Sequence, residues 1–253
     1  MKITLLGTGT SQGVPVIGCG CEVCRSLDYR DKRLRTSVHL AVGAQSLIID
    51  TGPDFRQQML REDIRRLDAV IFTHSHKDHT AGLDDVRAYN FLQKMDMPVY
   101  GHAYVLQQLT SEYAYAFGPH RYPGIPQLKL HAITDEPFVV GDTTITPLPV
   151  MHLNMPVYGF RVKDFSYITD ANAVSDMALD RLRGTRVLVL NALQREKHVS
   201  HFNLEEALMM AARIGAEKTY LTHISHKMGL HKEVEKELPA GVALAYDGLS
   251  FTL

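Results

Sequence analysis

The sequence has little of several features that mark particular classes of protein. Its three cysteines are too few and too clustered for a disulfide framework, and no apolar run approaches the ~20 residues of a membrane span. The 27 basic residues are matched by 28 acidic ones, so no electrostatic footprint for a nucleic-acid polymer or an anionic membrane is present. We find no internal repeat, linker or low-complexity tract. We therefore expect one domain, 1–253, with neither kind of partner.

The start of the chain is too short and too strand-like for a signal peptide. A reducing compartment suits the free cysteines, and in such a compartment a cysteine cluster suggests metal. These observations predict a cytoplasmic protein. They leave open whether it forms a homodimer.

Histidine, in contrast, is plentiful, with 13 residues, and its densest segment lies at positions 73–79. The segment follows Leu67–Phe72, an apolar run typical of a buried strand. Side chains two apart on an extended strand end point the same way, so His74 and His76 can share one ion. Asp78 and His79 lie where the chain turns into a helix, so we expect them to face a second ion. The alternative is a polar loop that happens to be rich in histidine.

Three further strands are predicted to end in a potential ligand. His152, Asp170 and His223 each follow an apolar run, and the carboxyl ends of strands are where α/β proteins gather their chemistry. Imidazole and carboxylate together form a borderline-to-hard ligand set, suited to zinc, manganese or iron rather than copper(I).

The cysteines lie together at C-x-C-x-x-C spacing, as Cys19, Cys21 and Cys24. Three thiolates at this spacing can occupy three corners of a tetrahedral zinc site, and a fourth ligand must come from elsewhere. The alternative is three small buried residues in a loop.

Other residues carry weaker signals. Asp50, at a predicted strand end, either caps the helix expected near Pro53 or takes part in chemistry. Arg87 either meets a substrate phosphate or forms an ion pair with Asp84. His201 precedes a predicted helix, where it can cap the helix, contact solvent or reach over the metal edge. The aromatic-rich segment 104–122 forms either a wall of a substrate cleft or part of the core.

The motif His74-x-His76-x-Asp78-His79 resembles the metal-binding signature of the metallo-β-lactamase superfamily. The resemblance implies an α/β fold, a four-layer αββα sandwich with two metal ions at one edge. It also implies how the ligands divide: His74, His76 and His152 on one ion, Asp78, His79 and His223 on the other, with Asp170 bridging. Asp50 would then hold a ligand imidazole in place.

Within the superfamily the chain most resembles the PhnP-type phosphodiesterases of the C–P lyase pathway. The resemblance runs nearly end to end and includes the cysteine motif, Thr222–His226 and Asp247-Gly248. It implies a structural zinc held by the three cysteines and His226. It also implies two active-site zinc or manganese ions that activate a hydroxide, and a small, cyclic phosphodiester as substrate. His201 is our candidate general acid for the leaving group.

Two other functions stay open. A relative in pyrroloquinoline quinone biosynthesis shares the fold and the cysteine-bound zinc but has an incomplete catalytic site, and it was long suspected of being a carrier. A thioester hydrolase of the glyoxalase II type shares the bridging aspartate. The complete ligand set of this chain, Asp170 and His223 included, favours a metal-dependent hydrolase.

Overall fold

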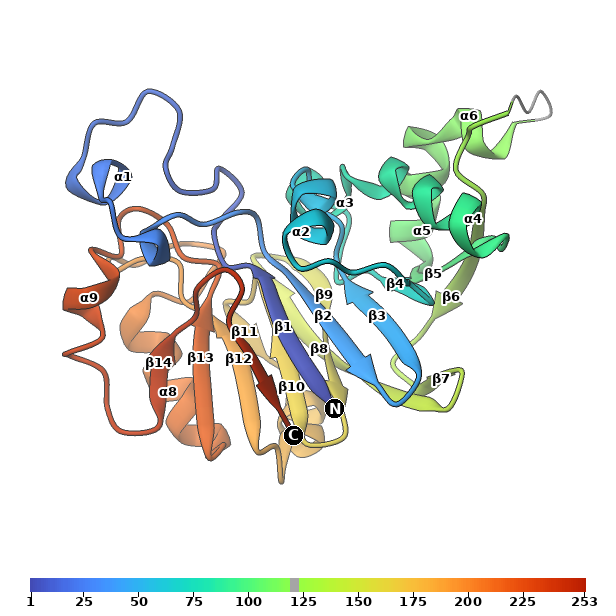
Figure 1. Ribbon diagram of the computed structural model, residues 1–253. Helices are drawn as coiled ribbons and strands as arrows, with labels where there is room; N and C mark the ends of the chain where they lie inside the picture. Colours follow the sequence, from blue (N-terminus) through green and yellow to red (C-terminus); the bar gives the residue numbers. More distant parts are fainter. Residues whose placement is uncertain (119–122) are drawn as a thin grey trace.

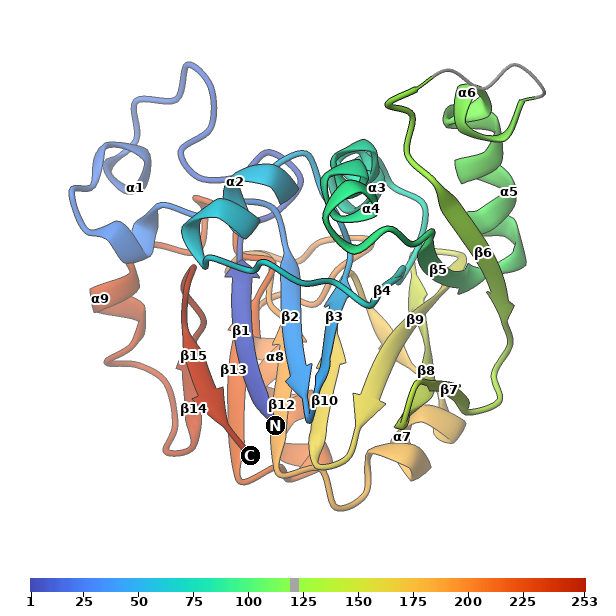
Figure 2. The same cartoon turned by 45° about the vertical axis from the view of Figure 1, so that its right-hand side comes forward.

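The structure, a computed structural model, describes residues 1–118 and 123–253. Two β-sheets pack face to face, and helices cover the outer face of each sheet (Figures 1 and 2). This is the α/β, four-layer αββα sandwich that the resemblance implies. Among the described residues, no helix combines the length and the apolar character needed to cross a bilayer.

Each sheet contains both antiparallel and parallel strands. Within residues 1–118 and 123–253 the first sheet has seven strands, in the order β15 (Ser250–Thr252), β1 (Lys2–Gly7), β2 (Ser37–Val42), β3 (Gln45–Ile49), β4 (Ala69–Ile71), β5 (Met97–His102) and β6 (Leu128–Ile133). The second has the path β11 (Ala173–Val174), β8 (Thr143–His152), β9 (Met155–Val162), β10 (Phe165–Ile168), β12 (Val187–Asn191), β13 (Lys218–Thr222) and β14 (Val242–Leu244), with β7 (Phe138–Val140) paired to β8.

The helices divide between the two outer layers. Those that follow strands of the first sheet are α2 (Phe55–Arg61), α3 (Lys77–Thr80), α4 (Arg87–Gln93), α5 (Ala103–Glu112) and α6 (Ala114–Phe117), with the 3₁₀ turn η2 (Leu83–Val86) before α4. Those of the second sheet are α7 (Asp176–Leu182), α8 (Leu204–Ile214) and α9 (His231–Val234), while α1 (Glu22–Arg25) and the 3₁₀ turn η1 (Tyr29–Asp31) lie in the cysteine-bearing loop.

Three apolar cores explain the layers. The central core lies between the sheets, where Leu40 on β2 and Phe160 on β9 are fully buried. A second core joins the first sheet to α2, α4 and α5, and a third joins the second sheet to α7 and α8. Because each sheet buries both faces, its central strands are apolar throughout rather than alternating.

The predicted elements are mostly present, with shifted ends. Alternation at 37–42 and 46–49 predicts a pair of strands with a turn at Gly43-Ala44, and β2 and β3 lie there. Strand β4 is shorter than the apolar run Leu67–Phe72 that contains it. The sequence also predicts a short helix over 232–238, and this prediction is wrong in extent, because α9 comprises only His231–Val234. Since β3 to β6 run parallel, as do β10, β12, β13 and β14, their carboxyl ends gather at one edge of the sandwich.

Candidate metal centre

The candidate ligands all lie on segments that leave the carboxyl ends of strands. His74 and His76 follow β4, and Asp78 and His79 belong to the short helix α3 that comes next. The other three come from the second sheet, listed with the strand that each ends or follows: His152 (β8), Asp170 (β10) and His223 (β13). Seven side chains spread over 150 positions of the chain are thus brought to one edge.

Three of the histidines form one cluster. The ligand-capable atoms of His74, His76 and His152 all lie within 4.8 Å of one another. The backbone carbonyl of Ser200 accepts a 2.9 Å hydrogen bond from Nδ1 of His152. Because Nδ1 must carry the proton in that bond, the lone pair of His152 is on Nε2, the form that binds a metal.

Asp50 fixes the tautomers of two more histidines, that of His79 directly and that of His74 through Thr73. Nδ1 of His79 donates to Oδ2 of Asp50 at 2.7 Å, and the Thr73 hydroxyl donates to the same oxygen at 2.8 Å. Since that hydroxyl has used its proton, it accepts one from Nδ1 of His74, 3.0 Å away. Both imidazoles therefore turn Nε2 toward the cluster, and in their neutral form that nitrogen carries the lone pair. Asp54, rather than Asp50, occupies the N-cap position of α2, so the capping alternative for Asp50 is wrong.

The second cluster is built around Asp170. Asp78, His79, Asp170 and His223 have their ligand-capable atoms within 4.8 Å of one another. Nε2 of His79 and Nε2 of His223 each lie 3.1 Å from a different carboxylate oxygen of Asp170. Asp170 also belongs to a group with His152 and His201, so its carboxylate lies between the two clusters.

The electrostatics of the second cluster are dominated by its carboxylates. Burial alone would lower the pKa of His79, but Asp170, Asp78 and Asp50 outweigh it and raise that pKa well above the usual value. Burial would likewise lower the pKa of His223, but Asp170 and Asp78 outweigh burial and raise that pKa to about 9. Buried carboxylates in this number favour positive charge in the space between them.

The backbone is strained at three of these positions. Asp50, Asp170 and His223 have φ of 65°, 53° and 57°, a left-handed conformation that is uncommon outside glycine. Asp50 and His223 come directly after a strand and Asp170 comes two residues after one, so each lies where the chain turns at the edge. Such strain costs about 1–3 kcal/mol per residue and clusters at functional sites. The sequence does not predict these left-handed conformations.

The residues fit divalent metal ions. Nε2 of His74, of His79 and of His223 are buried nitrogen atoms without a hydrogen-bond partner among the described residues, and such orphaned groups are costly unless something binds them. Imidazole nitrogens and carboxylate oxygens are the donors that zinc, manganese and iron accept. Two clusters that share one carboxylate suit two ions side by side.

His201 lies against the same carboxylate. Its Nε2 is 3.0 Å from Oδ1 of Asp170, and its ring stacks on that of His223 with centroids 4.8 Å apart. Burial lowers the pKa of His201 to about 4, against the Asp170 hydrogen bond, which raises it. The helix that follows, α8, is capped by Asn203 through a capping box with Glu206. His201 therefore does not cap the helix; it lies two residues before the N-cap.

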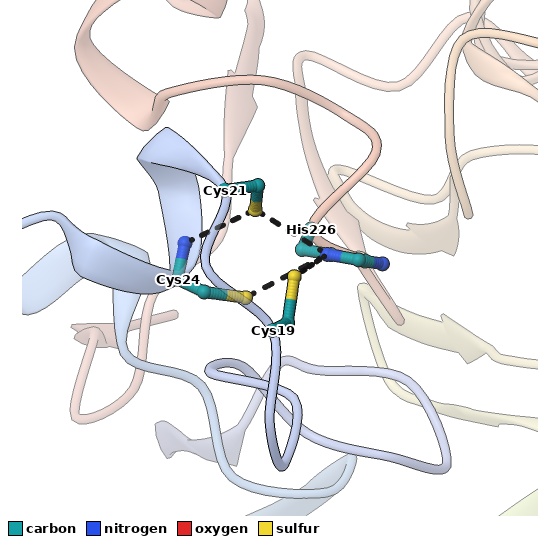
Figure 3. A group of neighbouring side chains, drawn as sticks. All are labelled: Cys19, Cys21, Cys24 and His226. Carbon is teal, nitrogen blue, oxygen red and sulfur yellow. Dashed lines mark hydrogen bonds between the residues drawn. The ribbon is translucent and has the colours of Figure 1, made fainter.

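The three cysteines and His226 form a separate cluster (Figure 3). The three Sγ atoms lie 3.3, 3.4 and 3.6 Å from Nδ1 of His226, and all four atoms lie within 4.8 Å of one another. The backbone N–H of Cys24 donates to Cys21 and lowers the pKa of that thiol to about 6. A thiolate-bearing Cys₃His set of this kind fits a tetrahedral zinc.

This cluster is joined to the edge by a short stretch of backbone. His226 comes three residues after His223, and between them the N–H of Ile224 donates to the carbonyl of Thr8 at 2.9 Å. The carbonyl of Ile224 in turn accepts from Thr10 at 3.2 Å. The loop after β1 is thereby pinned to the segment that carries His223.

A cavity of about 580 Å³, which we call the mouth, lies at the edge of the sandwich that carries the ligands. It is lined by His76 and His152 together with the apolar residues Leu153, Pro156 and Val199. Arg87 forms the ion pair with Asp84, 3.1 Å apart, that was its alternative interpretation. In the aromatic segment 104–122, Val105, Leu109 and Tyr113 join the core under α5, and the part of that prediction at 119–122 lies outside the described residues.

Comparison with known proteins gives a consistent result. The family model described as a beta-lactamase superfamily domain matches residues 45–224. A crystal structure described as a new diphosphatase from the PhnP family is 38% identical, with a TM-score of 0.93, and the match covers 100% of this chain and 97% of that one.

Two curated relatives add contrast. An octanoyltransferase of Porphyromonas gingivalis is 40% identical over 252 residues, which is 98% of this chain but 51% of the relative. The chain thus spans about half the length of that protein. The probable metallo-hydrolase YhfI of Bacillus subtilis is 26% identical over 215 residues, 77% of this chain and 81% of YhfI.

Proposed function

The chain belongs to the metallo-β-lactamase superfamily as a hydrolase close to the PhnP family, and from this premise we propose that it is a metal-dependent phosphodiesterase. Its substrates would be small molecules in which phosphorus carries two substituents through oxygen. Cyclic phosphodiesters and disubstituted diphosphates both meet this description. The related PhnP-family diphosphatase supports the phosphorus chemistry.

One observation carries the proposal: the carboxylate of Asp170 lies between two clusters of metal-type donors. His74, His76 and His152 would hold one divalent ion, Asp78, His79 and His223 the other, with Asp170 shared. Two such ions, when bound, supply Lewis acidity toward a phosphoryl oxygen and lower the pKa of water toward neutrality.

The remaining residues orient this set. Asp50 and Thr73 hold His74 and His79 in the tautomer that exposes Nε2, and the carbonyl of Ser200 does the same for His152. His201 points Nε2 at Asp170, which can only accept, so that nitrogen carries a proton. A proton held there, beside the two ligand clusters, is placed to reach a departing alkoxide.

The direct test is hydrolysis of bis-p-nitrophenyl phosphate by protein loaded separately with manganese, zinc, nickel or iron, with metal analysis alongside. We expect turnover with about two metal ions per chain beyond one in the cysteine cluster. Cyclic nucleotides, cyclic ribose phosphates and a disubstituted diphosphate then identify the preferred linkage. Absence of turnover with every metal, at full metal content, would contradict the proposal.

Two alternatives are tested in the same assay. The name of the Porphyromonas gingivalis relative directs attention to acyl chemistry, so an octanoyl thioester and a glutathione thioester belong in the screen. Thioester hydrolysis without phosphodiester hydrolysis would favour the glyoxalase II type. Tight ligand binding without turnover of either class would favour a carrier.

A further inference from the structure

A second cavity lies beside the mouth of the edge. It has a volume of about 270 Å³, near the small end of the range for small-molecule pockets, so it has room for one ring rather than for a polymer. Its lining consists of His102, Tyr104, Asp135 and Tyr158, together with the apolar residues Pro149, Pro156 and Val157. None of these residues belongs to the two ligand clusters.

The cavity adjoins the mouth. Pro156 lines both, and the mouth itself is lined by His76 and His152. Strand pairing places Met155 opposite His152 and Pro156 opposite Met151. On the other side, the backbone N–H of Tyr158 donates to the carbonyl of Thr73 at 3.1 Å, one residue before His74. A molecule whose phosphate lies at the mouth can therefore extend into this cavity.

The walls of the cavity are flat and aromatic. The rings of His102 and Tyr104 have centroids 4.9 Å apart, and those of His102 and Tyr158 have centroids 5.8 Å apart. The Tyr104 hydroxyl donates to the carbonyl of Pro156 at 3.1 Å, which joins the start of α5 to the start of β9 and holds the ring in place. Flat, fixed aromatic walls suit a planar ring, since stacking depends on the face and not on the substituents.

Asp135 gives the cavity a hydrogen-bond acceptor. One of its oxygens, Oδ1, accepts from the Tyr158 hydroxyl at 2.7 Å. Its side chain is exposed, while its backbone carbonyl accepts from Nη1 of Arg181. A carboxylate repels a phosphate and attracts N–H or O–H donors, so this end of the cavity suits the part of a substrate farthest from phosphorus.

We propose that this cavity, between Tyr104, His102, Tyr158 and Asp135, is a specificity subsite for the non-reacting substituent of the substrate. The substituent is a planar aromatic ring that carries an amino or hydroxyl donor. Tyr104 stacks on the ring, His102, tilted by 45° to Tyr104, contacts the ring edge, and Asp135 accepts from its donor. The inference rests on the proposed function for the position of the phosphate, but binding of the ring needs no turnover.

Equilibrium binding of four matched phosphate monoesters tests the subsite: methyl, cyclohexyl, phenyl and 4-aminophenyl phosphate, titrated calorimetrically into metal-loaded protein. All four esters share the phosphate group. Their substituent changes from a methyl group without a ring to a puckered ring, a flat ring and a flat ring with a hydrogen-bond donor. We expect phenyl phosphate to bind at least roughly fivefold more tightly than the methyl and cyclohexyl esters, from stacking alone. The 4-aminophenyl ester should bind more tightly again.

Variants assign the effect to residues. Tyr104→Ala should abolish the advantage of phenyl over methyl phosphate, whereas Tyr104→Phe, which keeps the ring, should preserve most of it. Asp135→Asn should remove only the added gain of the amino group. Phe91→Ala is the matched control, because Phe91 is an exposed aromatic residue on α4 that does not line the cavity. Thermal melting of each variant shows that it is folded.

The outcomes separate the subsite from the activity. Equal affinity for the methyl and phenyl esters, or a phenyl advantage that persists in folded Tyr104→Ala, would overturn the subsite whether or not bis-p-nitrophenyl phosphate is hydrolysed. A ring preference that depends on Tyr104 in a protein that hydrolyses no phosphodiester would uphold the subsite and reject the proposed function.

Discussion

Asp50 shows how much of the metal centre depends on residues that would not bind an ion. It is fully buried, adopts a left-handed φ and accepts hydrogen bonds from the Thr73 hydroxyl and from His79. The sequence suggested Asp50 only by analogy with relatives, and Thr73 carried no signal at all. A threonine before a histidine motif is too common to indicate that its hydroxyl relays a hydrogen bond.

Asp50→Asn should weaken metal binding. The Thr73 hydroxyl and His79 share one oxygen of Asp50, and the backbone N–H of Thr73 donates to the other oxygen. An amide turns its NH₂ group toward one of these two positions, so it loses either the Thr73 N–H bond or both bonds that fix the tautomers of His74 and His79. Loss of such a partner typically costs 10–100-fold in metal affinity or activity. Competition with a chromogenic chelator measures the affinity, and Asp180→Asn, at a surface ion pair, is the control. An unchanged affinity would mean that Asp50 has only a packing role.

His201→Ala separates two roles that its position allows. If His201 is the proton donor, turnover should fall by about 10²–10⁴-fold while the metal content is unchanged. If metal is lost together with activity, His201 is instead a ligand, as its proximity to His152 and Asp170 would permit. Elemental analysis beside kinetics distinguishes these results, and His131→Ala, on β6, controls for loss of an imidazole elsewhere.

At the scale of elements, the sequence was most informative where a strand is apolar and central. The apolar runs 143–150, 187–190 and 218–221 predict strands, and β8, β12 and β13 match them to within a residue or two. Strands β5, β6 and β9 and helix α7 were not predicted. β9, Met155–Val162, contains Pro156 and Gly159, which weaken its strand signal, and pairing with β8 over seven residues overrides that local preference.

The cysteine-bearing loop is the element whose order should depend most on a bound ion. Cys24 and Val23 are buried beside Val14, and few other apolar contacts hold the loop. We expect Cys21→Ser to lose one equivalent of zinc and to lower stability by about 2 kcal/mol or more, which in a chain of this size shifts the melting temperature by roughly 4–8 °C.

Catalysis should change much less in Cys21→Ser, provided that the active-site metals are saturated. Leu27→Ser, at an almost fully exposed position of the same loop, is the matched control. A Cys21→Ser protein of native stability that retains every metal ion would show that the cluster holds no structural zinc.

For the molecule as a whole, the stability of the sandwich should fall in mild acid, in part because of His39. This residue lies on β2, buried and hydrogen-bonded to Ser46 at 2.8 Å, where burial, with a smaller effect from Lys2, lowers its pKa from 6.5 to about 4. The unfolded chain therefore binds the proton at higher pH than the folded protein does. Between pH 6.5 and pH 4 the free energy of unfolding should decrease as the pH falls, by about 3 kcal/mol from this group.

Urea unfolding at several pH values measures this decrease. Because metal ligands also titrate in this range, the comparison is between the wild type and His39→Gln, each without metal. His39→Gln should show a shallower decrease below pH 6.5. Parallel curves for the two proteins would assign the acid sensitivity to other groups.

The overall architecture was predictable from the family motif, whereas the arrangement of cavities was not. A histidine motif with downstream His, Asp and His specifies which edge gathers the ligands, and so implies the sandwich. The cavity beside the mouth depends on His102, Asp135 and Tyr158, which come from β5, the turn after β6, and β9. Only the packed sheets bring these distant positions together.

The two chain ends meet on neighbouring strands. Lys2 pairs with Thr252, and the amino group of Met1 donates to the carbonyl of Leu253 at 2.5 Å. Both ends lie at the bottom of Figures 1 and 2, opposite the loops that leave the carboxyl ends of the parallel strands. A few-residue linker could therefore join them, and new ends could be cut elsewhere. A circular permutant in which residue 253 is linked to residue 1 should therefore keep the two ligand clusters intact.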